Sequence, residues 1–217
     1  MTLEGVEEAL QPYGLTVLGA FHPDADDMMP GTCGTLVMAG PEGAAFWRVF
    51  RESAEFSDGA ADPLNRWSMR VLGDVAETIG AEAHYPFGGP PWLPFVGWAK
   101  RTGRAWTSPV GLLVHDAAGM FVSYRGALAF ADRMALPKTG DPPCIPCARP
   151  CLSACPVGAL TAVGYDVPAC KSWIATEAGR DCLERGCAVR RACPVGADLR
   201  PEAQSAFHMA AFHGTDG

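Results

Sequence analysis

Apolar positions along the first part of the chain alternate between helical and extended patterns. Apolar residues at helical spacing predict a short amphipathic helix over residues 2–11. The runs LTVLGAF (15–21) and TLVMAG (35–40) predict buried strands, each bounded by loop residues. Further helices are expected over residues 42–55 and over residues 62–80, where an Asp-Pro pair offers a capping carboxylate followed by proline at the first helical position.

A proline- and tryptophan-rich stretch follows these elements. We expect YPFGGPPWLPFVGWAKRTGRAW (85–106) to form an ordered loop with one or two helical turns near residues 95–101. GLLVH (111–115) and MFVSYRGALAF (120–130) flank the turn DAAG, which predicts an antiparallel hairpin. The fold class is therefore expected to be α+β, with a layered domain on a mixed sheet over residues 1–136.

The length of 217 residues suits one large domain or two small ones. The first ten residues carry three glutamates, where a secretory signal would carry positive charge before an apolar run. No apolar stretch approaches the roughly 20 residues that a membrane-spanning helix needs. We therefore expect a cytoplasmic protein without a membrane partner, in which nine cysteines are metal ligands, catalytic groups or buried thiols rather than disulfides.

Charge is unevenly distributed along the chain. Residues 1–90 carry 14 acidic and 4 basic side chains, whereas residues 91–140 carry 2 acidic and 6 basic ones. The net charge of −7 and the lack of a basic run argue against a nucleic-acid partner, because phosphate neutralisation supplies most of that affinity. The basic middle of the chain is either a solvated face or a surface that steers an acidic redox partner protein or an anionic ligand.

Eight of the nine cysteines fall in the last third of the chain, and Cys33 stands alone. In CIPCARPCLSACP, three closely spaced thiolates can bind three irons of one cubane, while the fourth, followed by proline, turns toward a second cluster. The bacterial two-cluster pattern has two residues between its second and third cysteines. Three residues stand there in this chain, so the loop must bulge by one residue.

The pentapeptide CPVGA occurs twice, at residues 155–159 and 193–197. Such a repeat is typical of a pseudo-twofold ferredoxin with crossed ligation, in which the cysteine before each proline binds the other cluster. We therefore expect a small ferredoxin-like domain with two [4Fe-4S] clusters over residues 137–217, ending in a helix within PEAQSAFHMAAFH (201–213). The first cluster is assigned Cys144, Cys147, Cys151 and Cys193, and the second is assigned Cys155, Cys170, Cys182 and Cys187.

Other interpretations of the cysteines remain open. Two structural zinc sites use similar thiolates and short spacings, but zinc does not explain the repeated Cys-Pro pair. A single cluster beside a lost or substituted one is a second alternative. Cys33 is more typical of a buried or inert thiol than of a ligand.

The cysteine segment resembles the epoxyqueuosine reductases, two-cluster proteins related to the reductive dehalogenases. The stretches that carry the resemblance are GLLVHDAAG, CIPCARPCLSACPVGAL, ACKSWIATEAG and GCAVRRACP. The resemblance implies an α/β domain that binds a cobalamin beside a ferredoxin-like domain. Arg190 stands where the family has a cysteine, and Cys182 is inferred to replace that ligand. The acidic general acid of the family has no counterpart, because no Asp or Glu lies between Glu82 and Asp116.

Three functions follow from these features. The chain transfers single electrons to a partner protein or a bound cofactor, or it is an oxidoreductase that uses cobalamin, or it holds clusters for a structural or regulatory purpose. For the cobalamin alternative, the candidate cofactor-binding residues are Trp92, Trp106 and His115. No catalytic residue can be named from the sequence.

Overall fold

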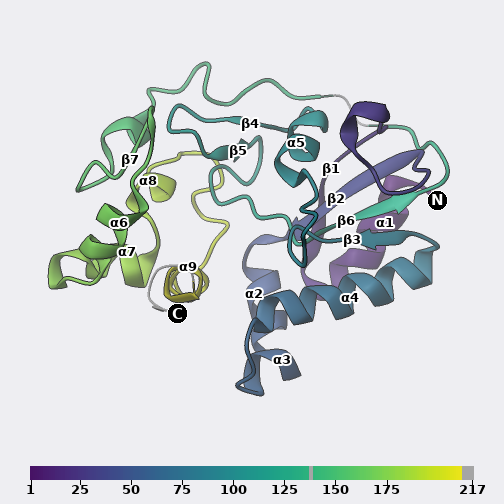
Figure 1. The fold of residues 1–217 in the computed structure, drawn as a ribbon, viewed down its shortest axis with the longest axis horizontal. Helices are drawn as coiled ribbons and strands as arrows, with labels where there is room; N and C mark the ends of the chain where they lie inside the picture. The colour runs from purple at the N-terminus through teal and green to yellow at the C-terminus, as the bar shows by residue number, and fades with distance from the viewer. Residues whose placement is uncertain (137–138, 212–217) are drawn as a thin grey trace. The chain divides into compact units, whose positions relative to one another are not determined.

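A computed structural model describes residues 1–136 and 139–211 (Figure 1). The chain divides into two compact units. The first comprises Met1–Ala105 and Ser123–Gly140, and the second comprises Trp106–Val122 and Asp141–Gly217. This division differs from the expected boundary at residue 136, because residues 106–122 group with the cysteine segment rather than with the preceding residues.

The first unit is built on a four-stranded sheet in the order β1-β2-β6-β3. Its strands are β1 (Leu15–Phe21), β2 (Thr35–Pro41), β3 (Glu82–His84) and β6 (Gly126–Phe130). Its helices are α1 (Leu3–Leu10), η1 (Gln11–Tyr13), η2 (Ala25–Asp27), α2 (Gly43–Arg51), α3 (Ala54–Ser57), α4 (Pro63–Ile79) and α5 (Phe95–Arg101). The α+β class is thereby confirmed.

The prediction of a mixed sheet is wrong, since every neighbouring pair in this sheet is antiparallel. Strand β6 lies between β2 and β3 in this sheet. Leu36 and Ala83 accordingly face Ala129 and Leu128 of β6. Because each of them is antiparallel to β6, β2 and β3 run parallel to each other, and the helical connection between them remains a crossover.

The predicted hairpin between residues 111–115 and 120–130 does not form. The first half contains β5 (Leu113–His115), and His115 closes a tight turn through a bridge with Gly119. The second half becomes β6, which pairs with β2 and β3 in the other unit. The turn DAAG is therefore real, but the strands on its two sides belong to different sheets.

The helices agree with the sequence except at two boundaries. The helix expected over residues 42–55 is divided into α2 and α3, because Ser53 starts α3 by accepting a hydrogen bond from the Phe56 N–H (3.3 Å). The predicted side-chain cap of Asp62 is absent from α4. Asp62 adopts a left-handed conformation (φ 50°), and its backbone carbonyl instead accepts the Arg66 N–H.

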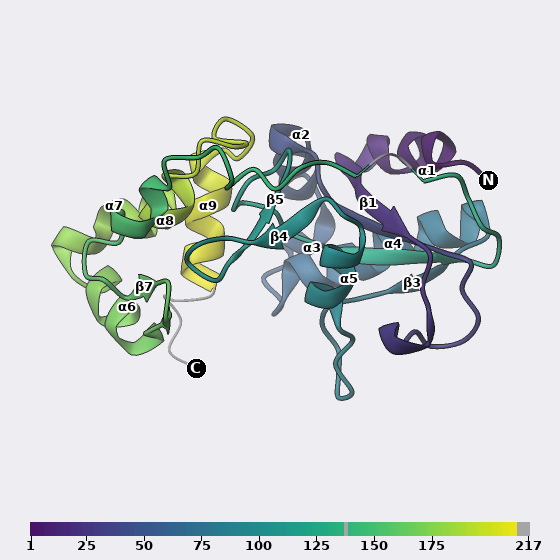
Figure 2. The same ribbon diagram turned by 90° about the horizontal axis from the view of Figure 1, so that it is seen from above.

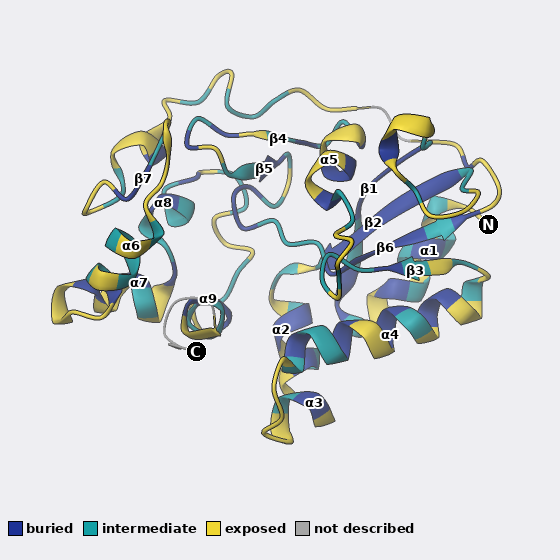
Figure 3. Cartoon of the chain, viewed as in Figure 1, coloured by how far each residue is buried: buried dark blue, intermediate teal, exposed yellow. Residues whose placement is uncertain are grey.

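Strand β2 is buried along most of its length (Figure 3), and alternation directs its side chains toward both faces of the sheet. Leu36 and Met38 pack with Trp98 of α5 in one hydrophobic cluster. The strand is buried from Thr35 to Gly40, so the intervening side chains lie on the opposite face, where α4 contacts β3 and β6. Trp67 of α4 meets Phe46 and Phe50 of α2 edge-on, with ring centroids 5.4 and 5.9 Å apart, which extends the apolar layer.

The second unit consists of short elements connected by loops. They are β4 (Ala105–Thr107), which starts at the unit boundary, β5, η3 (Pro150–Ser153), β7 (Leu160–Thr161), β8 (Gly164–Tyr165), α6 (Val167–Ile174), η4 (Glu177–Gly179), α7 (Arg180–Arg185), α8 (Ala188–Arg191) and α9 (Glu202–Met209). Helix α9 packs against α7 (Figure 2). It lies within the helix predicted over 201–213, of which residues 212 and 213 fall outside the described residues.

Among the helices of the described residues, none combines the length and the apolar character needed to cross a membrane.

Candidate metal centre

The eight clustered cysteines line two separate cavities of the second unit, four in each. The first cavity is lined by Cys144, Cys147, Cys151 and Cys193, together with Ser108, Pro109, Val114, Met120, Arg149, Pro150 and Pro194. The second is lined by Cys155, Cys170, Cys182 and Cys187, together with Pro156, Val157, Ala159, Leu160, Tyr165, Trp173, Ile174, Ala188, Val189 and Met209. The sequence assigns the same two groups of cysteines to the two clusters, and that assignment stays a prediction.

The loop around Cys147 contains the extra residue expected from the spacing. The loop bulges at Arg149, which adopts a left-handed conformation (φ 57°) immediately before η3 begins at Pro150. In this conformation the Arg149 N–H donates a hydrogen bond to Sγ of Cys147 (3.3 Å). The bulge therefore supplies a backbone donor to a candidate ligand, and Cys151 follows within the first turn of η3.

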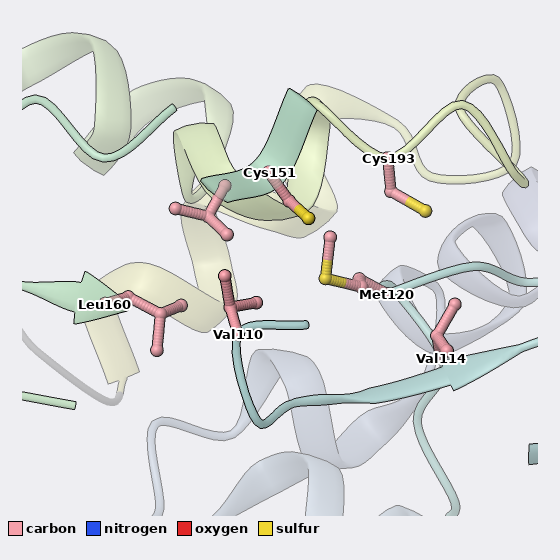
Figure 4. Close-up of a cluster of buried hydrophobic side chains, with 7 residues drawn as sticks. Val110, Val114, Met120, Cys151, Leu160 and Cys193 are labelled. Atoms are coloured by element: carbon pink, nitrogen blue, oxygen red, sulfur yellow. The ribbon is translucent and has the colours of Figure 1, made fainter. Parts of the chain in front are cut away.

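Segment 108–120 forms a wall of the first cavity. Val110, Val114 and Met120 share a buried cluster with Cys151 and Cys193, and both thiols are directed toward the side on which Met120 lies (Figure 4). The apolar run in GLLVH and the following turn were visible in the sequence. Their role beside the cysteines was missed, because they were assigned to a hairpin of the first domain.

Two glycines allow this segment to approach the second CPVGA repeat. Gly119 (φ 57°) lies against the carbonyl of Val195, and a Cβ atom there would overlap that oxygen. Gly196 (φ 64°) lies against the backbone of Ala117 and Ala118 in the same way. The left-handed conformation and the lack of a side chain at both positions place Cys193 at the cavity.

Local capping positions the thiols of the second cavity. Sγ of Cys155 accepts the Ala159 N–H (3.2 Å) within the first CPVGA turn. Asp166 caps α6 by accepting the Ala169 N–H (2.9 Å), which sets Cys170 in the first turns of that helix. Cys182, which we inferred from the sequence to replace the ligand missing at Arg190, is buried on α7.

Burial stabilises the neutral form of cysteine thiols at both cavities. It raises the pKa of Cys144 and Cys151, and the neighbouring thiols of the same cavity raise it further. Burial also raises the pKa of Cys170, although a hydrogen bond from the Tyr165 hydroxyl acts in the opposite direction. Because metal ligands must be thiolates, binding at these cavities would release protons.

Each cavity also contains one buried polar atom that lacks an acceptor. Ser108 Oγ lines the first cavity and Trp173 Nε1 belongs to a residue that lines the second, and neither has a hydrogen-bond partner within the described part of the chain. Buried donors are normally paired. A group with sulfur acceptors at the centre of each cavity would pair them, and the four thiols around it supply the ligands that iron-sulfur clusters take. The donor sets therefore fit such a cluster.

A site for a single metal ion would require several ligand side chains to meet at one point. Over residues 1–136 and 139–211, no three His, Cys, Asp or Glu side chains come together closely enough to hold one metal ion. The thiols are instead distributed along the cavity walls.

The residues predicted for a cobalamin do not form one site in either unit. Trp92 belongs to the first unit and is 66% exposed, whereas Trp106 and His115 belong to the second. His115 is fully buried, and its Nδ1 accepts the backbone N–H groups of Ala117 and Ala118 at 3.1 and 3.2 Å. These contacts assign His115 to the turn that ends at Gly119.

Cys33 lies in the first unit, half-buried against the cluster that includes Phe21 and Leu36. Burial raises the pKa of its thiol.

A scan against protein-family models finds no match to this chain. A search of curated proteins likewise finds no relative.

Proposed function

We propose that this chain is an electron-transfer protein that binds two [4Fe-4S] clusters and passes single electrons to a partner protein. The observation that carries the proposal is the division of eight cysteines, four and four, between two cavities that each hold a buried donor without an acceptor. Four thiolates around an enclosed space are the ligand set of a cubane cluster.

The order of the ligands supports crossed binding. Cys151 and Cys155 are four positions apart, yet they line different cavities. Cys193 completes the first set from the far end of the segment, while Cys155 joins Cys170 and two later cysteines. The two sites are therefore linked by one short stretch of chain, which suits transfer of an electron between them.

The residues around each cavity have separate roles in this proposal. A bound cluster supplies reversible one-electron chemistry. The thiolates hold it, the apolar walls of Val114 and Met120 or of Leu160 and Ile174 exclude water, and the N–H groups of Arg149 and Ala159 donate to ligand sulfurs. Exclusion of water and hydrogen bonds to sulfur are the means by which a protein sets a cluster potential.

Metal and sulfide analysis of anaerobically purified protein tests the proposal. We expect about eight irons and about eight acid-labile sulfides per chain, with a broad visible absorption that bleaches on reduction with dithionite. Zinc in place of iron would contradict it and favour two structural four-cysteine sites. About four irons would mean that one of the two cavities binds no cluster.

The cobalamin-dependent reductase that the resemblance implies stays a prediction. Addition of hydroxocobalamin to the iron-loaded protein tests it, since binding changes the corrin spectrum. Trp92→Ala tests whether Trp92 contributes to that binding, because this exposed side chain can be removed without opening a core cavity.

A further inference from the structure

Arg125 places a buried positive charge in the first unit, immediately before β6 begins. The residue is only 8% exposed. Its Nε donates to Oγ of Ser68 (2.9 Å) and its Nη2 donates to Oδ1 of Asn65 (2.7 Å), and both acceptors belong to α4. Both are uncharged, and within the described part of the chain no carboxylate forms an ion pair with Arg125.

This guanidinium is only partly compensated by its surroundings. It carries five N–H groups, and the bonds to Ser68 and Asn65 use two of them. The ring of Phe87 lies over it, with Cζ 5.4 Å from the ring centroid. A cation–π contact offsets part of the cost of removing a charge from water, and burial still lowers the pKa of Arg125 to about 10. An anion would supply the missing counter-charge.

The unused donors of Arg125 are accessible to a ligand. Nη1 has no hydrogen-bond partner over residues 1–136 and 139–211, yet it is not among the unpaired polar atoms that are sealed from solvent there. Nη1 and the second proton of Nη2 lie at the end of the planar guanidinium. Two parallel N–H groups in this geometry match two oxygens of a carboxylate or a phosphate.

The guanidinium is also held in place by the elements around it. The Arg125 N–H donates to the carbonyl of Ala39 in β2 (2.8 Å). The Tyr85 ring stacks on Phe87, with centroids 5.5 Å apart, and its hydroxyl donates to the carbonyl of Met69 in α4 (3.0 Å). Contacts with β2, α4 and the loop after β3 therefore fix the cation before any ligand arrives, which lowers the ordering cost of binding.

We propose that Arg125 anchors an oxyanion-binding site in the first unit, where a ligand presents a phosphate or a carboxylate group to Nη1 and Nη2. The charge of the ligand supplies the counter-ion that the fold leaves out, and the rigid guanidinium supplies the geometry. Every residue of this site lies in the first unit, whereas the cysteine cavities lie in the second. The inference therefore goes beyond the proposed electron transfer, and its test does not depend on whether iron binds.

Titration of the full-length chain with inorganic phosphate, and separately with acetate, tests the inference. The titrations are made at constant ionic strength and pH 7 and are followed by heteronuclear NMR. We expect saturable shifts of the signals of Arg125, Asn65 and Ser68. Saturation by phosphate alone would identify a phosphate ligand, and saturation by acetate alone a carboxylate ligand. If neither anion gives saturable shifts, the inference is overturned.

Two variants and a control locate the binding. Asn65→Asp puts a carboxylate at the present 2.7 Å contact, so it should stabilise the fold and weaken anion binding by about tenfold. Arg125→Met should abolish the binding, whereas Arg48→Met, which removes an exposed arginine of α2, should leave it unchanged. Binding in Asn65→Asp as tight as in the unmodified chain would refute the site, and this variant decides alone if Arg125→Met does not fold. An equal loss in Arg48→Met would reveal diffuse surface binding and refute it too.

Discussion

The guanidinium of Arg190 donates a hydrogen bond of 2.9 Å to the carbonyl oxygen of Met120, although 70 positions separate the two residues. Arg200 makes the equivalent contact with the carbonyl of Phe121 (2.6 Å) and stacks over its ring. Two half-buried arginines thus hold the end of segment 106–122 in the second unit. This contact explains why that segment lies with the cysteines rather than with the sheet that follows it.

Gly196→Ala should destabilise the iron-loaded protein more than Gly158→Ala does. The two glycines occupy equivalent positions in the CPVGA repeats and share a φ of 64°, so both variants incur the left-handed cost of about 1 kcal/mol. Only at Gly196 would the new Cβ overlap the backbone of Ala117 and Ala118, which adds about 2 kcal/mol. Urea unfolding of both variants measures the difference, and equal losses would contradict the close packing at Gly196.

Cys182→Ser should lower the iron content by about half, because it removes one thiolate of a four-ligand set while leaving the other cavity intact. Cys33→Ser is the control, and it should retain all the iron because Cys33 lies in the first unit. Iron and sulfide analysis after anaerobic purification measures both. Full iron retention in Cys182→Ser would show that Cys182 does not replace the ligand missing at Arg190.

Ser108→Ala should speed the loss of iron to a chelator by about fivefold, equivalent to the ~1 kcal/mol of one hydrogen bond. The buried Ser108 hydroxyl lines the first cavity and is available to donate to a sulfur there. Ser153→Ala, an exposed serine whose hydroxyl donates to Pro150, should leave the rate unchanged. A rate for Ser108→Ala equal to that of the unmodified chain would exclude this donor from the site.

Glu55→Gln should reduce the stability of the first unit by about 1 kcal/mol at neutral pH. The Arg70 side chain binds both carboxylate oxygens at 2.5 and 3.0 Å, and this hydrogen bonding lowers the pKa of Glu55. The stabilisation is therefore complete above the unfolded pKa of about 4.3 and is lost as the pH falls through the lower folded value.

Urea unfolding at pH 6 and at pH 3 checks this sign. The difference between the unmodified chain and Glu55→Gln should shrink at pH 3, whereas Glu52→Gln, at an exposed position at the end of α2, should have little effect at either pH. A difference that grows on acidification would contradict the ion pair as its source.

Local patterns were enough for most elements of the first unit. The strand predicted over residues 15–21 has those bounds in the structure, and the helical turns near residues 95–101 form α5. Local patterns could not show that β6 separates β2 from β3, since pairing partners are chosen by packing over long sequence distances. The mixed sheet was therefore predicted where an antiparallel one occurs.

The sequence by itself predicted which cysteines group together at each cavity, because the spacing around Cys151 and Cys155 and the repeated Cys-Pro pair are properties of a short stretch of chain. Only the tertiary structure decided what surrounds them. Ser108 and Met120 line the first cavity from a segment that precedes all four of its cysteines, and Arg190 holds Met120 through a hydrogen bond to its carbonyl. No local pattern encodes such contacts. Burial then decides their effect, because a charge or donor that is screened at the surface acts strongly once water is excluded.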